Sequence, residues 1–284
     1  MAIRGVTKNV AVNGPVSKNT DEAEIFVPNQ IDRRNGRMTD GMNWLTRPGF
    51  YPKWNLGIDE NVKLLIPEGT GYAVSKNGRI FQLDKDLNTP VTELTGAKLR
   101  GIYRPNWIKN GAMIIVCDGR NPVKSVGASA VDILGGSPSN FRFIGMIGPY
   151  TIGCGHSDTE FKWSASNNPE NWTTGDSGFA NVKTDGVIRG MMIQKELVYL
   201  FKDQSIEIWY NRGGATPFVR IEYIERGLAA SDSIIKDGSH SCFIGNDNRF
   251  YKLEGTAVSV ISSPYEKYIQ AMVNFDQVVG YHFA

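Results

Sequence analysis

The sequence has few of the residues that would indicate a disulfide framework, a metal centre or a membrane span. Its 284 residues include three cysteines, Cys117, Cys154 and Cys242, none of them in a Cys-x-x-Cys spacing. An odd number of widely spaced cysteines is typical of buried thiols in a chain that folds in a reducing cytosol. The longest apolar run, residues 112–117, is too short to cross a bilayer, and the N-terminus has no apolar signal core. We therefore expect neither membrane contact nor secretion through a cleaved signal.

An excess of charge of one sign is also missing. Thirty-one basic and 29 acidic residues give a formal net charge of +2. A general nucleic-acid binder normally has a stronger basic bias or a dense patch of Lys and Arg. Any contact with DNA must therefore be local or arise from assembly.

The candidate metal sites are incomplete. Residues 84–88 begin like a calcium-binding loop, but Thr89 stands where that loop needs glycine and Thr95 where it needs a bidentate Glu. His240 and Cys242 form a close pair of histidine and cysteine, and two ligands do not make a zinc site. We expect a polar turn in the first case, and no metal or other cofactor in the chain.

The sequence does contain segments in which apolar and polar residues alternate with a period of two. Between residues 196 and 209, Leu197, Tyr199 and Phe201 precede a polar turn, and Ile206 and Ile208 follow it. This pattern predicts two strands, each with one buried and one wetter face. No long amphipathic helix is visible, and the best short helical candidate is residues 265–272, directly after Pro264.

Hairpin-like units recur along the chain, with centres roughly forty residues apart, as expected of four-stranded propeller blades. They cover residues 71–83, 111–126, 141–163, 190–209 and 240–261. The Asn77-Gly78 pair in the first unit predicts a type I′ turn. The sequence therefore predicts an all-β chain, a β-propeller with about five visible blades.

The two ends of the chain differ from this pattern. Residues 1–60 are rich in Asn, Arg, Gly and Pro, which predicts an irregular N-terminal arm before a propeller domain over residues 61–284. Residues 277–284 alternate like a strand and stop without a polar tail. Either this strand closes the ring against an N-terminal one, or the ring is incomplete and the chain continues. We favour continuation, because an unpaired apolar edge promotes aggregation.

Residues 161–172 form a distinctive unit. We expect a strand through Phe161 and Trp163, a turn at 167–169, and a return of Trp172 toward the strand that it left. The unit is loosely similar to the Asp-box of sialidases, but the Asp and Gly of that box are missing. A glycosidase also needs two carboxyl groups at a defined separation, which sequence cannot place. We expect no enzyme activity, and we expect Trp163, Trp172 and Trp209 to be core residues.

A series of short motifs follows in a recognisable order. Pro48 and Gly49 precede the first hairpin, residues 113–119 form a strand that ends in Asp-Gly, and the Trp163 to Trp172 turn comes next. The most specific stretch combines Glu207, Trp209, Asn211 and Gly213 with Pro217 and Phe218. Taken together, the series resembles the packaged-DNA stabilisation proteins of short-tailed bacteriophages, which are also tail accessory, head-completion or hub factors.

This resemblance implies a non-enzymatic structural protein of the virion tail, assembled in the host cytoplasm. Such a protein would form a hexameric ring below the portal and its adaptor protein. It would stabilise the packaged genome and serve as the hub for the tail needle and the tailspikes. The motif residues would then be structural.

Two groups of residues in the arm are candidate contacts. Arg33, Arg34 and Arg37 could face DNA phosphates, non-specifically, or an acidic patch on the adaptor; the alternative is a solvated basic loop. Trp44 and Trp54 could anchor an intersubunit contact, because buried aromatic residues carry much of the energy of interfaces. They could equally close the base of the propeller.

A second function stays open. A carbohydrate- or receptor-binding propeller, similar to a lectin or a glycoside hydrolase, would bind or cleave sugars as an isolated module. An assembly factor would instead form rings or join the portal and adaptor, and would not bind glycans.

Overall fold

A computed structural model describes residues 36–38, 44–46, 56, 61–67, 71–84, 90–99, 103–120, 122–126, 130–136, 139–183, 186–214, 216–238 and 240–280. The chain divides between residues 53 and 54 into two units. In the first unit, β1 (Gly36–Met38) and β2 (Trp44–Thr46) form an antiparallel pair. This short ladder lies within the segment that we expected to be irregular.

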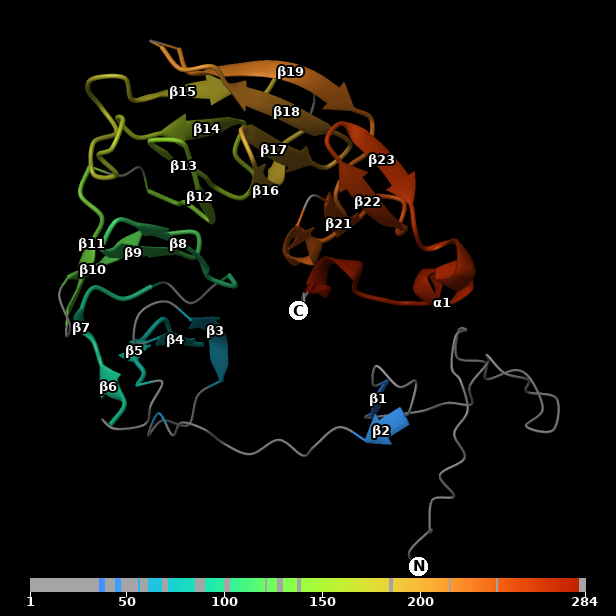
Figure 1. The fold of residues 1–284 in the computed structure, drawn as a ribbon, viewed down its shortest axis with the longest axis horizontal. Helices are drawn as coiled ribbons and strands as arrows, with labels where there is room; N and C mark the ends of the chain where they lie inside the picture. Colours follow the sequence, from blue (N-terminus) through green and yellow to red (C-terminus); the bar gives the residue numbers. More distant parts are fainter. Residues whose placement is uncertain are drawn as a thin grey trace, which may run out of the picture. The chain divides into compact units, whose positions relative to one another are not determined.

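The second unit contains five antiparallel sheets, which follow one another in chain order (Figure 1). Sheet 1 contains β3 (Val62–Ile66), β4 (Tyr72–Ser75), β5 (Ile80–Gln82) and β6 (Thr92–Glu93). Sheet 2 contains β8 (Asn106–Asn110), β9 (Met113–Cys117), β10 (Val123–Val126) and β11 (Ala130–Ile133). The short strand β7 (Thr95–Gly96) adds to sheet 2 in parallel with β11.

The remaining three sheets have four strands each. Sheet 3 contains β12 (Phe143–Ile147), β13 (Tyr150–Cys154), β14 (Glu160–Trp163) and β15 (Gly178–Asn181). Sheet 4 contains β16 (Ile188–Gln194), β17 (Leu197–Lys202), β18 (Ile206–Asn211) and β19 (Phe218–Ile224). Sheet 5 contains β20 (Ile235–Asp237), β21 (His240–Ile244), β22 (Phe250–Glu254) and β23 (Ala257–Val260).

The fold is a β-propeller. In each sheet the main strands pair in the order in which the chain forms them. Residues at or beside the first of these strands in all five sheets, β3, β8, β12, β16 and β20, line one common cavity, as expected when blades are arranged around an axis. The predicted fold class and the five predicted blades are therefore confirmed.

Consecutive sheets pack face to face through four apolar clusters. Val74 and Val116 belong to the cluster between sheets 1 and 2, and Ile115 and Phe141 to the cluster between sheets 2 and 3. The clusters between sheets 3 and 4 and between sheets 4 and 5 are the two largest. Because burial of each large apolar side chain contributes roughly 1.5–3 kcal/mol, these clusters are the main source of stability.

Strand β17 shows how this packing differs from the prediction. Val198 and Leu200 face the cluster shared with sheet 3, whereas Tyr199 and Phe201 face the cluster shared with sheet 5. All four side chains are at most 1% exposed. The predicted alternation and strands are correct, but the predicted wetter face is wrong, because a neighbouring sheet covers each side of sheet 4.

The turn after β4 also differs from the prediction. Gly78 has φ +77°, whereas Asn77 does not have a positive φ, so the turn is not of type I′, which needs two such residues. Gly78 N–H donates to the Ser75 carbonyl at 3.1 Å, and Ser75 N–H donates to the Arg79 carbonyl at 2.9 Å. A Cβ on Gly78 would lie 2.4 Å from the Leu99 carbonyl oxygen. Glycine is therefore required both by conformation and by this close approach.

The C-terminal segment is irregular. The 3-10 turn η3 (Ser263–Tyr265) has Pro264 at its start and leads into the helix α1 (Glu266–Gln270). The predicted helix is therefore confirmed. A further 3-10 turn, η4 (Phe275–Gln277), precedes an extended stretch in which Gly280 N–H donates to the Asp232 carbonyl at 2.8 Å. The predicted strand over residues 277–284 is wrong for its described part, which joins no sheet.

Candidate functional site

The most specific motif of the sequence forms a buried polar network in sheet 4. Glu207 lies on β18, and both its side chain and that of Lys202, at the end of β17, are 0% exposed. Lys202 Nζ donates to Glu207 Oε1 at 3.1 Å, and Trp209 Nε1 donates to Glu207 Oε2 at 3.1 Å. Lys183 N–H also donates to Glu207 Oε1, at 2.9 Å. The carboxylate therefore ties together two strands and the segment that arrives from sheet 3.

The period of the strand explains this arrangement. Glu207 and Trp209 are two residues apart on β18, so their side chains share a face of the sheet. The indole ring thus reaches back to the carboxylate while it packs in the cluster between sheets 3 and 4. A buried charge is tolerated when a partner charge and hydrogen bonds compensate for the lost water.

The rest of the motif builds the turn from β18 to β19. Asn211 Oδ1 accepts from Gly213 N–H at 3.1 Å, and Gly213 has φ +70°. Arg212 N–H donates to the Pro217 carbonyl at 2.8 Å. Phe218, the first residue of β19, is 6% exposed and packs in the cluster between sheets 3 and 4. These contacts fix the turn and position Phe218 in the core.

The tryptophans Trp163, Trp172 and Trp209 are 5%, 8% and 3% exposed, which agrees with the expected core positions. The chain returns to the end of β14 as expected, since Ala165 N–H donates to the Asn171 carbonyl at 2.6 Å, but the Trp172 ring does not pack on that strand. It packs edge to face with Phe141, with ring centroids 5.2 Å apart, between sheets 2 and 3. Trp163 packs on the other side of sheet 3, in the cluster shared with sheet 4.

Most of the candidate contacts in the arm lie outside the described residues. Arg37 pairs with Leu45 in the β1–β2 ladder, and Trp44 pairs with Met38. The other candidate contacts, Arg33, Arg34 and Trp54, are outside the described part of the chain, as are the motif residues Pro48 and Gly49. Their predicted roles stay predictions.

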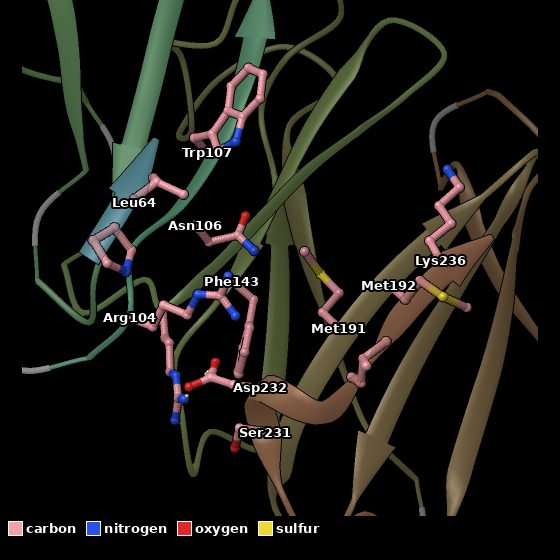
Figure 2. A pocket seen from close by; sticks show the side chains of 13 residues that line it. Leu64, Arg104, Asn106, Trp107, Phe143, Met191, Met192, Ser231, Asp232 and Lys236 are labelled. Carbon is pink, nitrogen blue, oxygen red and sulfur yellow. Dashed lines mark hydrogen bonds and ion pairs between the residues drawn. The ribbon is translucent and has the colours of Figure 1, made fainter. Parts of the chain in front are cut away.

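A central cavity of about 310 Å³ is the site that sequence reasoning missed (Figure 2). All five sheets contribute to it, with Leu64 from β3, Asn106 from β8, Phe143 from β12, Met191 from β16 and Lys236 from β20. Three of its lining side chains are basic and one is acidic. The strands provide apolar walls, and the basic side chains provide a positive potential.

Arg142, directly before β12, is the most buried charged residue of this cavity, at 6% exposure. Its guanidinium carbon lies 4.3 Å from the ring centroid of Tyr103 and 5.1 Å from that of Phe143. Its Nη2 donates to Asp232 Oδ1 at 3.2 Å. Gly119 makes room for this stack, because a Cβ there would lie 2.5 Å from Tyr103 Cδ2.

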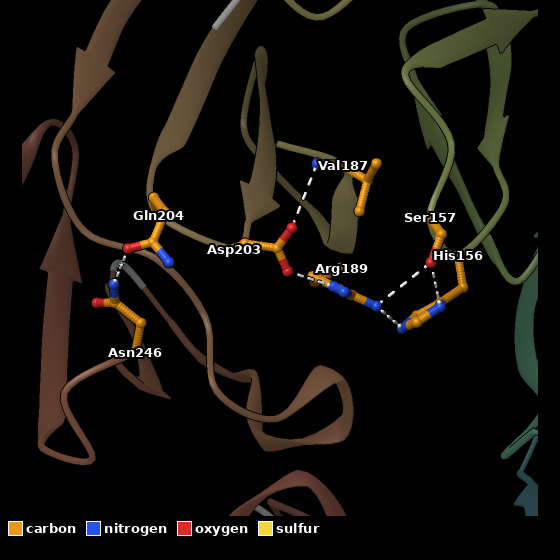
Figure 3. A network of polar contacts seen from close by, with 7 residues as sticks. All are labelled: His156, Ser157, Val187, Arg189, Asp203, Gln204 and Asn246. Atoms are coloured by element: carbon orange, nitrogen blue, oxygen red, sulfur yellow. Dashed lines mark hydrogen bonds and ion pairs between the residues drawn. The ribbon is translucent and has the colours of Figure 1, made fainter. Parts of the chain in front are cut away.

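A second cavity, of about 730 Å³, adjoins the first and shares Arg104, Arg142 and Asp232 with it. Figure 3 shows a polar network at its wall. Arg189 forms an ion pair with Asp203 and donates from Nη1 to His156 Nε2 at 3.3 Å. The Nδ1 of His156 lies 3.0 Å from Ser157 Oγ.

This network holds His156 neutral. Burial, together with the charges of Arg142 and Arg189, lowers the pKa of His156 from 6.5 to about 4. Because Arg189 can only donate, Nε2 accepts, and Nδ1 of the neutral ring donates to Ser157 Oγ. A nucleophilic serine must instead give its proton to the histidine. The Ser157–His156 pair therefore has the wrong polarity for nucleophilic catalysis.

No pattern in the sequence marks the cavity. Arg104, Arg142 and Lys236 are spread over more than a hundred residues, and only the arrangement of the sheets around an axis brings them together. Within the described ranges, no group of three His, Cys, Asp or Glu side chains could hold a metal ion. Within the same residues, every helix is too short or too polar to span a bilayer.

Comparisons with known proteins add similarities in fold. No protein-family model matches the sequence, and no curated protein matches it. The surface component PorZ of the type-IX secretion system of Porphyromonas gingivalis is 9% identical over 71% of this chain, with a TM-score of 0.47. The chain covers 28% of PorZ.

Two other solved structures are similar over comparable lengths. YCF48 from Cyanidioschyzon merolae is 8% identical, with a TM-score of 0.48 over 67% of this chain and 68% of its own. Hsv2 from Kluyveromyces lactis is 13% identical, with a TM-score of 0.47 over 68% of this chain and 60% of its own. No activity or partner is carried over from these proteins.

The first prediction concerns the buried ion pair. Glu207→Gln removes the negative charge 3.1 Å from Lys202 Nζ, and we expect the free energy of unfolding to fall by about 3–5 kcal/mol. The double variant Lys202→Met/Glu207→Leu should be less destabilised than the sum of its single variants, because it removes both charges of the buried pair and leaves only the partly exposed Arg220, 3.8 Å from Glu207, without its partner. Urea denaturation monitored by tryptophan fluorescence measures both effects.

The matched control is Lys252→Gln, which breaks the exposed pair between Lys252 and Glu254. It should cost less than about 1 kcal/mol, as exposed ion pairs do. A Glu207→Gln variant as stable as this control would contradict the assigned role of the network.

The second prediction concerns pH. The folded chain protonates His156 only near pH 4, whereas the unfolded chain does so near pH 6.5. Between these values the unfolded state binds more protons, so the stability that depends on neutral His156 is complete above pH 6.5 and is lost as the pH falls toward 4.

Urea midpoints measured between these two pH values should therefore fall less steeply with acidification in His156→Asn than in the wild type. Arg212→Gln, on the exposed turn between β18 and β19, lies outside this network and serves as the control, which should retain the wild-type slope. Urea midpoints that fall equally steeply with acidification in His156→Asn and in the wild type would contradict the assignment of this pH dependence to His156.

Proposed function

We propose that this chain is a non-enzymatic structural protein of the virion tail of a short-tailed bacteriophage. It lies below the portal and its adaptor, stabilises the packaged genome, and provides attachment for the tail needle and the tailspikes. The observation that carries the proposal is the network around Glu207. The residues with the most specific resemblance to the packaged-DNA stabilisation proteins are those that this network and the adjoining turn require.

The network supports a scaffold role for a physical reason. A charge buried between two sheets is stable only when its partners stay within hydrogen-bond distance, so the network penalises any shift of β17 against β18. Sheet 4 is thereby held rigid at its centre. A hub that carries several partners benefits from such a body, because its loops can vary while the scaffold stays in place.

Exposed apolar side chains support self-association and contact with partners. Ile261, Tyr265, Tyr268, Met272 and Val273 are 46%, 50%, 57%, 43% and 80% exposed. Such a concentration of exposed apolar groups over one short segment is typical of interaction sites. We assign this segment to contacts within a hexameric ring or with the portal adaptor.

The polarity of the Ser157–His156 pair supports the non-enzymatic part of the proposal, because the serine accepts the hydrogen bond and is not activated. A contact with packaged DNA through Arg33, Arg34 and Arg37 belongs to the same proposal and rests on their basic charge. As a component of the virion tail, the chain would be assembled into the particle in the host cytoplasm.

A carbohydrate- or receptor-binding propeller is the second candidate. The polar central cavity favours it, since small-molecule sites combine apolar walls with a few placed polar groups. A glycan array probed with the purified chain separates the two candidates. Specific retention of one glycan class supports the second candidate, and uniform lack of binding supports the first.

The third prediction tests the tail assignment. Quantitative peptide mass spectrometry of purified virions from the source phage should detect this chain at a molar ratio of ~0.5 to the portal protein, as expected for a sixfold ring on a twelvefold portal. A host cytosolic protein, measured in the same preparation, sets the level of contamination. Absence of the chain above that level from mature particles would contradict the proposal.

A further inference from the structure

The guanidinium of Arg142 has donor capacity that its protein contacts do not use. The side chain is 7% exposed, and its one hydrogen bond among the described residues runs from Nη2 to Asp232 Oδ1, at 3.2 Å. Its Nε is buried and has no hydrogen-bond partner there. A guanidinium carries five N–H donors in a planar fork, and buried donors are nearly always paired. The guanidinium of Arg142 therefore has N–H donors from which no described residue accepts a hydrogen bond.

The surroundings of Arg142 hold the group in a fixed orientation. The rings of Tyr103 and Phe143 lie 4.3 and 5.1 Å from its guanidinium carbon. Asp232 offers one oxygen at 3.2 Å, and its own side chain is 28% exposed, so the ion pair is a single contact at the edge of the cavity. A planar, oriented fork is the arrangement that recognises carboxylate and phosphate groups.

The charge of the cavity favours an anion. Arg104, Arg142 and Lys236 line it with Asp232 as the one acidic side chain. Lys236 Nζ donates to the Ile193 carbonyl at 3.0 Å, which places its ammonium group beside β16. A cavity with this excess of positive charge concentrates anions.

The volume and the walls limit what the anion can be. About 310 Å³ is at the lower end of the range of small-molecule sites, so the ligand is a small molecule. Leu64, Phe143, Met191 and Met192 form apolar parts of the wall, which suits a ligand with an apolar or ring-shaped body.

We propose that the central cavity binds a small oxyanion, through a carboxylate or phosphate group that the guanidinium of Arg142 holds and that Arg104 and Lys236 attract. The lining of the cavity does not include the exposed segment 261–273 that we assign to contacts with partners. Because the test uses the isolated chain, its failure would leave the tail assignment intact, and absence of the chain from virions would leave the site intact.

The fourth prediction is that the purified full chain binds inorganic phosphate or glucuronate in isothermal titration calorimetry, and that methyl glucoside, the neutral probe, does not bind. Phosphate and glucuronate are titrated separately, and the tighter of the two identifies the anionic group. Arg142→Gln should weaken that binding about tenfold or more, because hydrogen bonds to charged groups are the strong ones.

Arg212→Gln is the matched control. Arg212 is exposed on the turn between β18 and β19, where its Nη2 donates to Thr216 Oγ1 at 2.9 Å, so its loss should leave the affinity unchanged. If circular dichroism shows that Arg142→Gln is unfolded, Arg142→Lys and Lys236→Gln replace it. The first keeps the charge without the fork and the second removes a neighbouring charge, and each should weaken binding.

The proposal is overturned if neither phosphate nor glucuronate binds the wild-type chain. It is also overturned if the folded variants at Arg142 and Lys236 bind as tightly as the wild type, since the anion would then lie elsewhere. The proposal is likewise overturned if methyl glucoside binds as tightly as the anionic probes, because recognition would then not depend on charge.

Discussion

Each sheet of this propeller buries most of its apolar side chains against a neighbouring sheet, and the rest of the structure depends on that mutual packing. Four clusters join the five sheets in series. Sheet 4 is packed on both faces, with Val198 and Leu200 on one side of β17 and Tyr199 and Phe201 on the other. Cooperative stability follows, because removing one sheet exposes a face of its neighbours.

The same packing sets the place of the polar groups. Between sheets 3 and 4 the Lys202–Glu207 pair is fully buried and is held by Trp209 and the Lys183 amide. Around the axis, strands that are far apart in sequence meet with their basic side chains directed at one cavity. The packing of the sheets thus produces both a rigid frame and a preorganised positive cavity. The proposed hub depends on the rigid frame, and the proposed anion site depends on the cavity.

Sequence patterns could predict the features that depend on local spacing. The recurrence of hairpins predicted five blades, and Pro264 marked the short α-helix that the described residues contain. Features that depend on neighbouring sheets could not be predicted. Both faces of β17 are buried because sheets 3 and 5 cover them, Trp172 packs on Phe141 of another segment, and Gly78 is required by the distant Leu99 carbonyl. Arg142 lies 38 residues from Arg104 in sequence, and only the fold brings the two side chains to one cavity.

Amide hydrogen exchange of the intact chain tests the central claim most directly. The hydrogen-bonded amides of β17 belong to a sheet packed on both faces, whereas those of β22 belong to sheet 5, which shares a cluster with one neighbour among the described residues. We predict that β17 exchanges most slowly, at the free energy of global unfolding, and that β22 exchanges about tenfold faster or more through local opening. Exchange of β17 as fast as, or faster than, that of β22 would contradict the account.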